Sequence, residues 1–136
     1  MLDLNRREKD VRLFVRALEE WIIQTLWRFN VQGHVRDGRV GVWVERPDRG
    51  YSPLTEDKIA AIGVRTSRGR TLHGFALNVC TDLAMFDHII ACGLAGRPVT
   101  SLANEGFDVT MDEVMAAIRK SAMATWGVSA SVAMAR

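Results

Sequence analysis

The chain has 136 residues, of which 48% are hydrophobic and 25% charged, and its formal net charge is +2. This length and balance indicate one soluble globular domain spanning residues 1–136. So small a net charge does not indicate nucleic-acid binding, and no apolar run approaches the roughly 18 residues of a membrane span. The charged first residues are not a signal peptide, and the two cysteines therefore indicate free thiols in the reducing cytoplasm.

The first predicted element is a helix over Asp10–Phe29. Its apolar residues recur at steps of three and four, at Val11, Phe14, Val15, Leu18, Ile22, Leu26 and Phe29. Asp10 can cap the start by accepting a hydrogen bond from a free backbone amide, and Asn30 can end the helix. Trp21 and Trp27 are expected to widen the buried face.

A short strand and a long loop follow. Asp37-Gly38 is a turn pair, and the alternation that follows predicts a half-buried strand with Val40, Val42 and Val44 on one side. The segment Arg46–Asp57 carries prolines, a glycine and several charges, and it is predicted to be an exposed loop. At about a dozen residues it is unusually long. Two interpretations of this loop stay open: a flap over a site and a tolerated surface insertion.

Two β-type runs, Lys58–Thr66 and Thr71–Val79, are joined by turn residues and predict a hairpin. Beyond them a short apolar segment ends at Cys92-Gly93. Strand pairing would fix this thiol and the glycine would leave room for a substrate, so Cys92 is a candidate nucleophile. Free cysteines are more often small buried hydrophobes, and on the residues alone both interpretations stay open.

A second helix is predicted at the C-terminal end. Thr110 and Glu113 form a capping box, in which each side chain satisfies a free backbone amide of the other. The apolar stripe that follows consists of Val114, Ile118, Ala122 and Trp126. The order of the elements along the chain is a helix, then strands connected by hairpins, then a second helix. This order predicts an α+β fold with a mainly antiparallel sheet and flanking helices.

Four sequence blocks occur in a fixed order: K-I-A-A-I-G-V-R from Lys58, T-L-H-G-F-A-L-N-V from Thr71, F-D-H-I-I-A-C-G from Phe86 and V-T-S-L from Val99. In order and spacing they resemble the octanoyltransferases, or lipoyl(octanoyl) transferases, of protein lipoylation. This resemblance implies the fold of the biotin/lipoate transferase–ligase catalytic domain. It also implies transfer of an octanoyl group from octanoyl-acyl carrier protein to a lysine of a lipoyl domain, with neither cofactor nor metal. The implied acceptors are the lipoyl domains of 2-oxoacid dehydrogenases and the glycine cleavage H protein.

The resemblance also implies roles for individual residues. The cysteine of the family's C-G block forms an acyl-thioester intermediate, which implies that role for Cys92. The lysine that opens the K-I-A-A-I-G block lies beside this cysteine and lowers its pKa, which implies that role for Lys58. An ammonium about 4 Å from a thiolate, at an effective dielectric near 20, stabilises the thiolate by up to roughly 4 kcal/mol. This attraction is large enough to lower the pKa of the thiol as the role requires. By default, a lysine at the start of a strand is a solvated end residue.

Small residues in the paired runs are candidates for substrate binding. The family's matching segments contact the acyl chain, which implies this role for Ala61, Ile62, Gly63, Gly74, Phe75 and Ala76. The alternative is that Gly63 and Gly74 mark bulges or tight packing in the sheet.

The resemblance is incomplete. The family's R-G-G-x-x-T-x-H-G-P-G-Q segment, which lines the acyl pocket, has no counterpart in this sequence. The chain is therefore expected to be the C-terminal portion of the catalytic domain. One alternative function is a non-catalytic fragment that binds a lipoyl domain or a partner half. Another is a lipoate–protein ligase-like enzyme, which the C-G block and the lack of a nucleotide-binding glycine motif disfavour.

Overall fold

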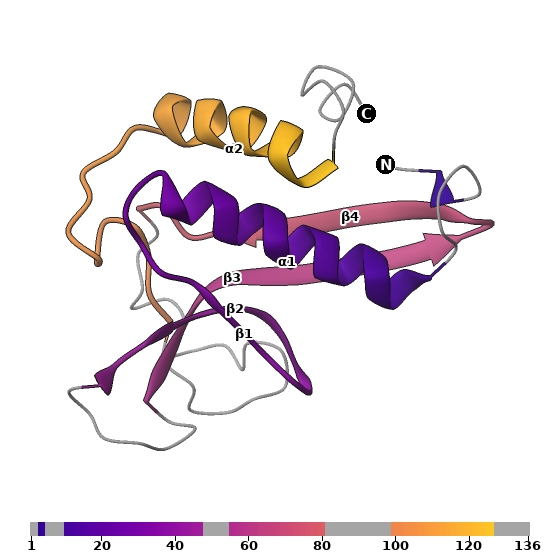
Figure 1. Ribbon diagram of the computed structural model, residues 1–136, viewed down its shortest axis with the longest axis horizontal. Helices are drawn as coiled ribbons and strands as arrows, with labels where there is room; N and C mark the ends of the chain where they lie inside the picture. The colour runs from indigo at the N-terminus through magenta and orange to yellow at the C-terminus, as the bar shows by residue number, and fades with distance from the viewer. Residues whose placement is uncertain (1–2, 5–9, 48–54, 81–98, 127–136) are drawn as a thin grey trace.

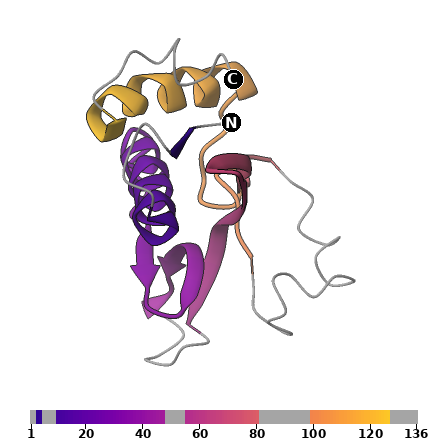
Figure 2. The same cartoon turned by 90° about the vertical axis from the view of Figure 1, so that its right-hand side faces the viewer.

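The computed structural model describes residues 3–4, 10–47, 55–80 and 99–126. Within these ranges the elements are α1 (Val11–Trp27), β1 (His34–Arg36), β2 (Arg39–Glu45), β3 (Glu56–Ser67), β4 (Arg70–Leu77) and α2 (Met111–Trp126). The strands form one antiparallel sheet in the order β1-β2-β3-β4. Helix α1 packs on the sheet and α2 packs on α1 (Figures 1 and 2). The predicted α+β class with an antiparallel sheet is confirmed.

Helix α1 begins as predicted. The Asp10 side chain accepts a hydrogen bond from the Arg12 amide at 2.8 Å. The helix ends at Trp27, slightly before the predicted end, and Asn30 turns the chain with a φ of 59°. The expectation that Trp27 is buried is wrong, because its side chain is 57% exposed. Successive helical residues point about 100° apart, and the neighbouring Leu26, fully buried, takes the core position.

Trp21 joins three elements of the core. Its indole N–H donates to the carbonyl of Ile118 on α2 at 2.8 Å. Its ring meets Phe75 of β4 edge-on at 5.5 Å and Trp126 of α2 at 6.0 Å between centroids. The predicted burial of Trp21 is therefore confirmed, and this side chain fixes both helices over β4.

The predicted capping box starts α2. Glu113 accepts from the Thr110 amide at 2.7 Å, and the Glu113 amide donates to the Thr110 hydroxyl at 3.2 Å. The predicted stripe is buried at Val114, Ile118 and Ala122. No helix in the described part of the chain has the length and apolar character needed to cross a membrane.

Strand β2 is buried on both faces, so the prediction of a half-buried strand is wrong. Val42 and Val44 are buried as expected, but Trp43 is also only 1% exposed, and Val40 is 51% exposed. A register shift lies between Val42 and Trp43. The face that bears Trp43 is covered as well, by the long side chains of Arg39 and Lys58.

The predicted β3–β4 hairpin is confirmed, with a tighter turn than expected. Only Arg68 and Gly69 separate the strands, with φ values of 51° and 76°. Positive φ at both positions matches the right-handed twist of paired strands. Asp3 forms an antiparallel bridge with Arg70, and the Leu4 amide donates to the Gly69 carbonyl. The N-terminal residues therefore lie beside this end of β4.

Candidate active site

Lys58 is a buried lysine in β3 rather than a solvated strand end. The residue is 5% exposed and pairs across the ladder with Trp43 of β2. Its Nζ lies 5.1 Å from the centroid of the Trp43 ring, a distance at which a cation interacts with an aromatic face. Lysines are rarely buried unless neighbouring groups interact with them, so the residues around Lys58 are expected to stabilise a lysine at this position.

Gly41 makes the room that Lys58 occupies. The glycine has a φ of +129°, and a Cβ added there would lie 2.5 Å from Cε of Lys58 and 2.7 Å from the carbonyl oxygen of Ala60. Both the backbone angle and the space exclude a larger residue. The side chain of Lys58 therefore runs directly over the β2 backbone.

Two further stretches of chain meet at Lys58. Val99 forms a parallel bridge with it, and the Thr100 amide donates to its carbonyl at 2.9 Å. The Asn78 amide donates to the Ile59 carbonyl at 3.0 Å, and its side-chain nitrogen donates to the Thr100 carbonyl at 3.1 Å. The chain therefore leaves the sheet, and returns to it, beside the candidate lysine.

Cys92 lies in segment 81–98, outside the described residues, so its position relative to Lys58 stays a prediction. Val99, the first described residue after that segment, bridges Lys58. An extended chain spans at most about 3.6 Å per residue, so Cys92 can lie no farther from Val99 than the residues between them can reach. The other cysteine, Cys80, is a free, exposed thiol.

A cluster centred on Arg46 fixes the backbone around Lys58. The Arg46 guanidinium donates to Asp57 at 2.7 Å, to the Thr100 hydroxyl at 3.2 Å and to Glu105. The Thr100 hydroxyl also donates to Glu105 at 2.5 Å. These side chains come from the residue after β2, the start of β3 and the returning segment. The cluster therefore ties together the three pieces of backbone that surround the lysine.

Opposite charges in this cluster stabilise the charged forms of Arg46 and Glu105. The bond to Glu105 raises the pKa of Arg46 against the opposing effect of burial, with Asp57 adding to the rise. Burial favours a higher pKa for Glu105, but the hydrogen bonds from Arg46 and Thr100 and the charge of Arg46 lower it overall. Both groups are therefore held in their charged forms.

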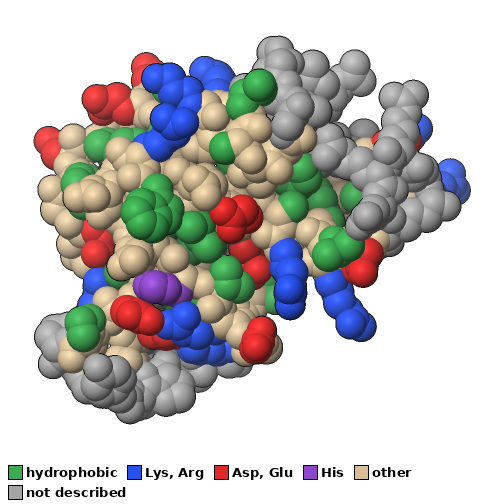
Figure 3. Space-filling view, viewed as in Figure 1, with side chains coloured by type: hydrophobic (Ala, Val, Ile, Leu, Met, Phe, Trp, Pro, Cys, Tyr) green, Lys and Arg blue, Asp and Glu red, His purple; other side chains and the backbone are tan. Residues whose placement is uncertain are grey.

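The predicted exposed loop Arg46–Asp57 is wrong at its C-terminal end. Glu56 and Asp57 belong to β3 and are only 7% and 2% exposed. Glu56 is buried because it pairs with Arg36 at 2.5 Å and Arg39 at 2.7 Å. On the face of the molecule drawn in Figure 3, acidic and basic side chains lie interspersed. Residues 48–54 lie outside the described ranges, so the proposal of a flap there stays a prediction.

The six predicted acyl-binding residues lie together in the hairpin. They form three adjacent cross-strand pairs, Ala61–Ala76, Ile62–Phe75 and Gly63–Gly74. Phe75 contacts Trp21, so the middle pair faces α1. Because side chains alternate along a strand, the other two pairs share the opposite face. We call Ala61, Gly63, Gly74 and Ala76 the small-residue patch.

Among the described residues, nothing covers the two glycines of the small-residue patch. A Cβ at Gly63 or Gly74 would meet nothing within 4 Å in the described structure. The register through the patch is continuous, so neither glycine marks a bulge. Backbone with free space beside it can accept an extended apolar chain, so acyl binding here stays a prediction.

Glu19 is a residue that the sequence interpretation missed. It is only 4% exposed, and its carboxylate accepts from the Gly41 amide at 3.2 Å. Burial raises its pKa, while the bond from Gly41 and the charge of Arg16 oppose the rise. The available signal was its spacing, four residues after Val15 and three before Ile22, on the apolar stripe of α1.

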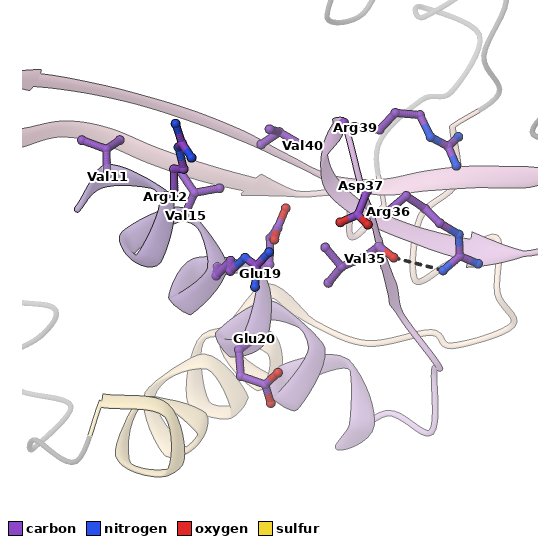
Figure 4. Close-up of a pocket in the computed structure, with 12 residues that line it drawn as sticks. Val11, Arg12, Val15, Glu19, Glu20, Val35, Arg36, Asp37, Arg39 and Val40 are labelled. Atoms are coloured by element: carbon purple, nitrogen blue, oxygen red, sulfur yellow. Dashed lines mark hydrogen bonds between the residues drawn. The ribbon is translucent and has the colours of Figure 1, made fainter.

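Glu19 also lines a groove of about 590 Å³ between α1 and the β1–β2 hairpin (Figure 4). Val11, Val35 and Val40 contribute apolar walls to this groove. Within the described ranges, no group of three or more histidine, cysteine, aspartate or glutamate side chains is placed to hold a metal ion.

Comparison with known proteins agrees with this architecture. Residues 1–122 match the model of the lipoyl protein ligase A/B catalytic domain. The chain is 52% identical over 124 residues to an octanoyltransferase of Paracoccus denitrificans, covering 89% of this chain and 57% of that protein. It is 51% identical to an octanoyltransferase of Paracoccus versutus, covering 89% of this chain and 80% of that protein.

A solved structure shares the fold. A bi-partite lipoate protein ligase from Thermoplasma acidophilum superposes with a TM-score of 0.66 at 21% identity, covering 88% of this chain and 47% of that one. The fold is thus that of a lipoate protein ligase catalytic domain. The chain belongs to the lipoyl protein ligase A/B catalytic domain family. It spans 57% of the first of the two curated relatives, little more than half.

Proposed function

We propose that this chain is the C-terminal part of the catalytic domain of an octanoyltransferase in lipoate biosynthesis. The observation that carries the proposal is the burial of Lys58, at the head of the K-I-A-A-I-G block, where the chain returns from the Cys92 segment. Identity of about half the residues to curated octanoyltransferases supports it. The donor is octanoyl-acyl carrier protein. The acceptors are lipoyl domains of 2-oxoacid dehydrogenases and the glycine cleavage H protein, in the cytoplasm.

The proposed reaction has two steps. The Cys92 thiolate attacks the thioester carbonyl of the donor, forms a new thioester and expels the carrier thiolate, which takes up a proton. The ε-amine of the acceptor lysine then attacks the acyl-enzyme, loses a proton and expels the Cys92 thiolate, giving an N6-octanoyl amide. The donor thioester itself supplies the activation.

Lys58 serves both steps in this proposal. Its ammonium stabilises the Cys92 thiolate, because a cation next to a thiol favours the ionised form. As the first step ends, this ammonium donates its proton to the departing carrier thiolate, and the neutral amine that remains accepts the proton that the attacking lysine loses in the second step. The small-residue patch holds the octanoyl chain along β3 and β4.

Intact-mass spectrometry tests the proposal. Incubation with octanoyl-acyl carrier protein should add one octanoyl group, and a lipoyl domain should then remove it. Cys92→Ser should abolish the adduct, whereas the matched control Cys80→Ser, which removes a free, exposed thiol, should keep it, because the proposed thioester forms on Cys92. An adduct that persists in Cys92→Ser would defeat the assignment.

A second candidate is a lipoate–protein ligase-like activity, which the fold of the archaeal ligase favours. That reaction would consume ATP and form an acyl-adenylate. ATP–pyrophosphate exchange in the presence of lipoate would support this candidate, and its absence alongside a Cys92 adduct would exclude it.

A further inference from the structure

We propose that Glu19 is a positioning residue for Lys58, acting through the Gly41 amide. This inference rests on the proposed function only for the catalytic importance of Lys58, since the contacts themselves are structural. The link runs through one backbone position of β2.

The first half of the link is the hydrogen bond. Glu19 points from α1 toward the strands, whereas the adjacent Glu20 points away from them (Figure 4). One oxygen of the buried Glu19 carboxylate accepts from the Gly41 amide at 3.2 Å. A buried amide left without a partner is costly, because it has lost its hydrogen bond to water, so this bond holds Gly41 in place.

The second half is the contact between Gly41 and Lys58. The glycine backbone lies so close to Cε of Lys58 that a Cβ would sit only 2.5 Å away. The Nζ of the same side chain lies 5.1 Å from the centroid of the Trp43 ring, two residues along β2. A shift of the Gly41 backbone would therefore move the lysine relative to this ring.

Three features indicate that the role of Glu19 at this position is its hydrogen bond with the Gly41 amide. An acid sits on the apolar stripe of α1, where a leucine or methionine would normally pack. Gly41 has a φ of +129°, which few residues adopt and which needs external support. Burial also raises the pKa of Glu19, so the carboxylate is held there at an energetic cost.

The test compares Glu19→Met, which fills the same volume without an acceptor, with Glu19→Gln, which keeps one. Glu20→Met is the matched control, because Glu20 is exposed and bonds Gln24 on the outer side of α1. Two readouts are measured in the full chain. One is kcat for octanoyl transfer at saturating octanoyl-acyl carrier protein.

The second readout is the NMR signal of the Lys58 ε-methylene in protein labelled with ¹³C-lysine. Lys9, Lys58 and Lys120 are the lysines of the sequence, so assignment is direct. In the wild type, the Trp43 ring current should displace the Lys58 signal from those of a solvated lysine. Glu19→Met should move it toward the solvated position and lower kcat about tenfold or more, with KM little changed. Glu19→Gln and Glu20→Met should leave both readouts near wild type.

Unchanged Lys58 signals in Glu19→Met would overturn the proposal, as would equal impairment of Glu19→Gln and Glu19→Met. A wild-type Lys58 signal at the solvated position would overturn it without any variant, even where Glu19→Met fails to fold. Failure of the proposed function is distinguishable, because the NMR readout needs no transferase activity.

Discussion

Trp43 and Lys58 face each other across the β2–β3 ladder, and the lysine nitrogen lies 5.1 Å from the centre of the indole ring. The guanidinium carbon of Arg39 lies 4.8 Å from the same ring. The indole is almost fully buried, and its N–H donates to the Arg39 carbonyl at 3.3 Å. A single aromatic side chain thus provides the apolar surface against which the candidate catalytic cation is held.

Removal of this ring should destabilise the fold and disturb the site. Trp43→Ala is expected to lower the free energy of unfolding by about 3–5 kcal/mol, because it leaves a large cavity beside Lys58. Trp43→Phe should cost less, since it keeps an aromatic face. Urea unfolding followed by circular dichroism measures both, and a loss below about 1 kcal/mol for Trp43→Ala would contradict the packing described here.

Substitutions in the small-residue patch are expected to slow octanoyl transfer without lowering the stability of the fold. At Gly63 an added Cβ meets nothing within 4 Å, and the backbone angle is one that alanine adopts. Gly63→Ala should therefore leave stability unchanged or raise it by roughly 0.4–1 kcal/mol through the unfolded chain. Octanoyl transfer should slow, because the new methyl group stands where the acyl chain would lie on the backbone.

A second patch variant and a control variant test this prediction further. Gly74→Ala, across the ladder in the same patch, should have the same effect. Gly38→Ala is the control, since Gly38 lies in the β1–β2 turn with a φ of +74°. It should lower stability and spare transfer per folded molecule. Transfer at the wild-type rate in both patch variants would remove the patch from the site.

Loss of Arg46 should be costly. Arg46→Met leaves the Asp57 carboxylate, with only 3% of its side chain exposed, without its cation. Breaking such a buried pair from one side costs about 3–5 kcal/mol. Arg65→Met, at an exposed position of β3, should change stability by less than about 0.5 kcal/mol. Equal effects of the two substitutions on the urea midpoint would mean that the Arg46 cluster does not stabilise this region.

The same cluster predicts a pH dependence. The pKa of Glu105 is lowered below its ordinary value of 4.5, so its ionisation stabilises the fold at pH values above 4.5. That contribution is lost as the pH falls through 4.5 and then through the lower pKa of the folded protein. The stability difference between wild type and Glu105→Gln should therefore shrink between about pH 6 and about pH 3. A difference that stays constant over this pH range would contradict this assignment.

Local signals made much of the fold predictable. Asp10 and the Thr110–Glu113 box mark helix starts through short-range hydrogen bonds, which depend on a few neighbouring residues only. The β3–β4 hairpin was predictable for the same reason. The family resemblance also singled out Lys58, whose burial beside Trp43 no local pattern indicates.

The errors arose where long-range partners decide burial. Glu56, Asp57 and Glu19 are charged residues that are buried because arginines or a backbone amide from other elements meet them. Trp27 is a large aromatic left exposed because the neighbouring Leu26 faces the core. Helical spacing does place Glu19 on the apolar stripe of α1 and Trp27 beside it. It does not identify the partners from other elements that allow a charged side chain to be buried.

Peptide-level mass spectrometry of the acyl-enzyme is the most direct test of the central claim that Lys58 activates Cys92. A reaction with octanoyl-acyl carrier protein, stopped with acid, should place the octanoyl group on the peptide containing Cys92. Lys58→Met should strongly slow its formation in protein that remains folded. An octanoyl group found on Cys80, or formed on Cys92 at the same rate in Lys58→Met, would contradict the account.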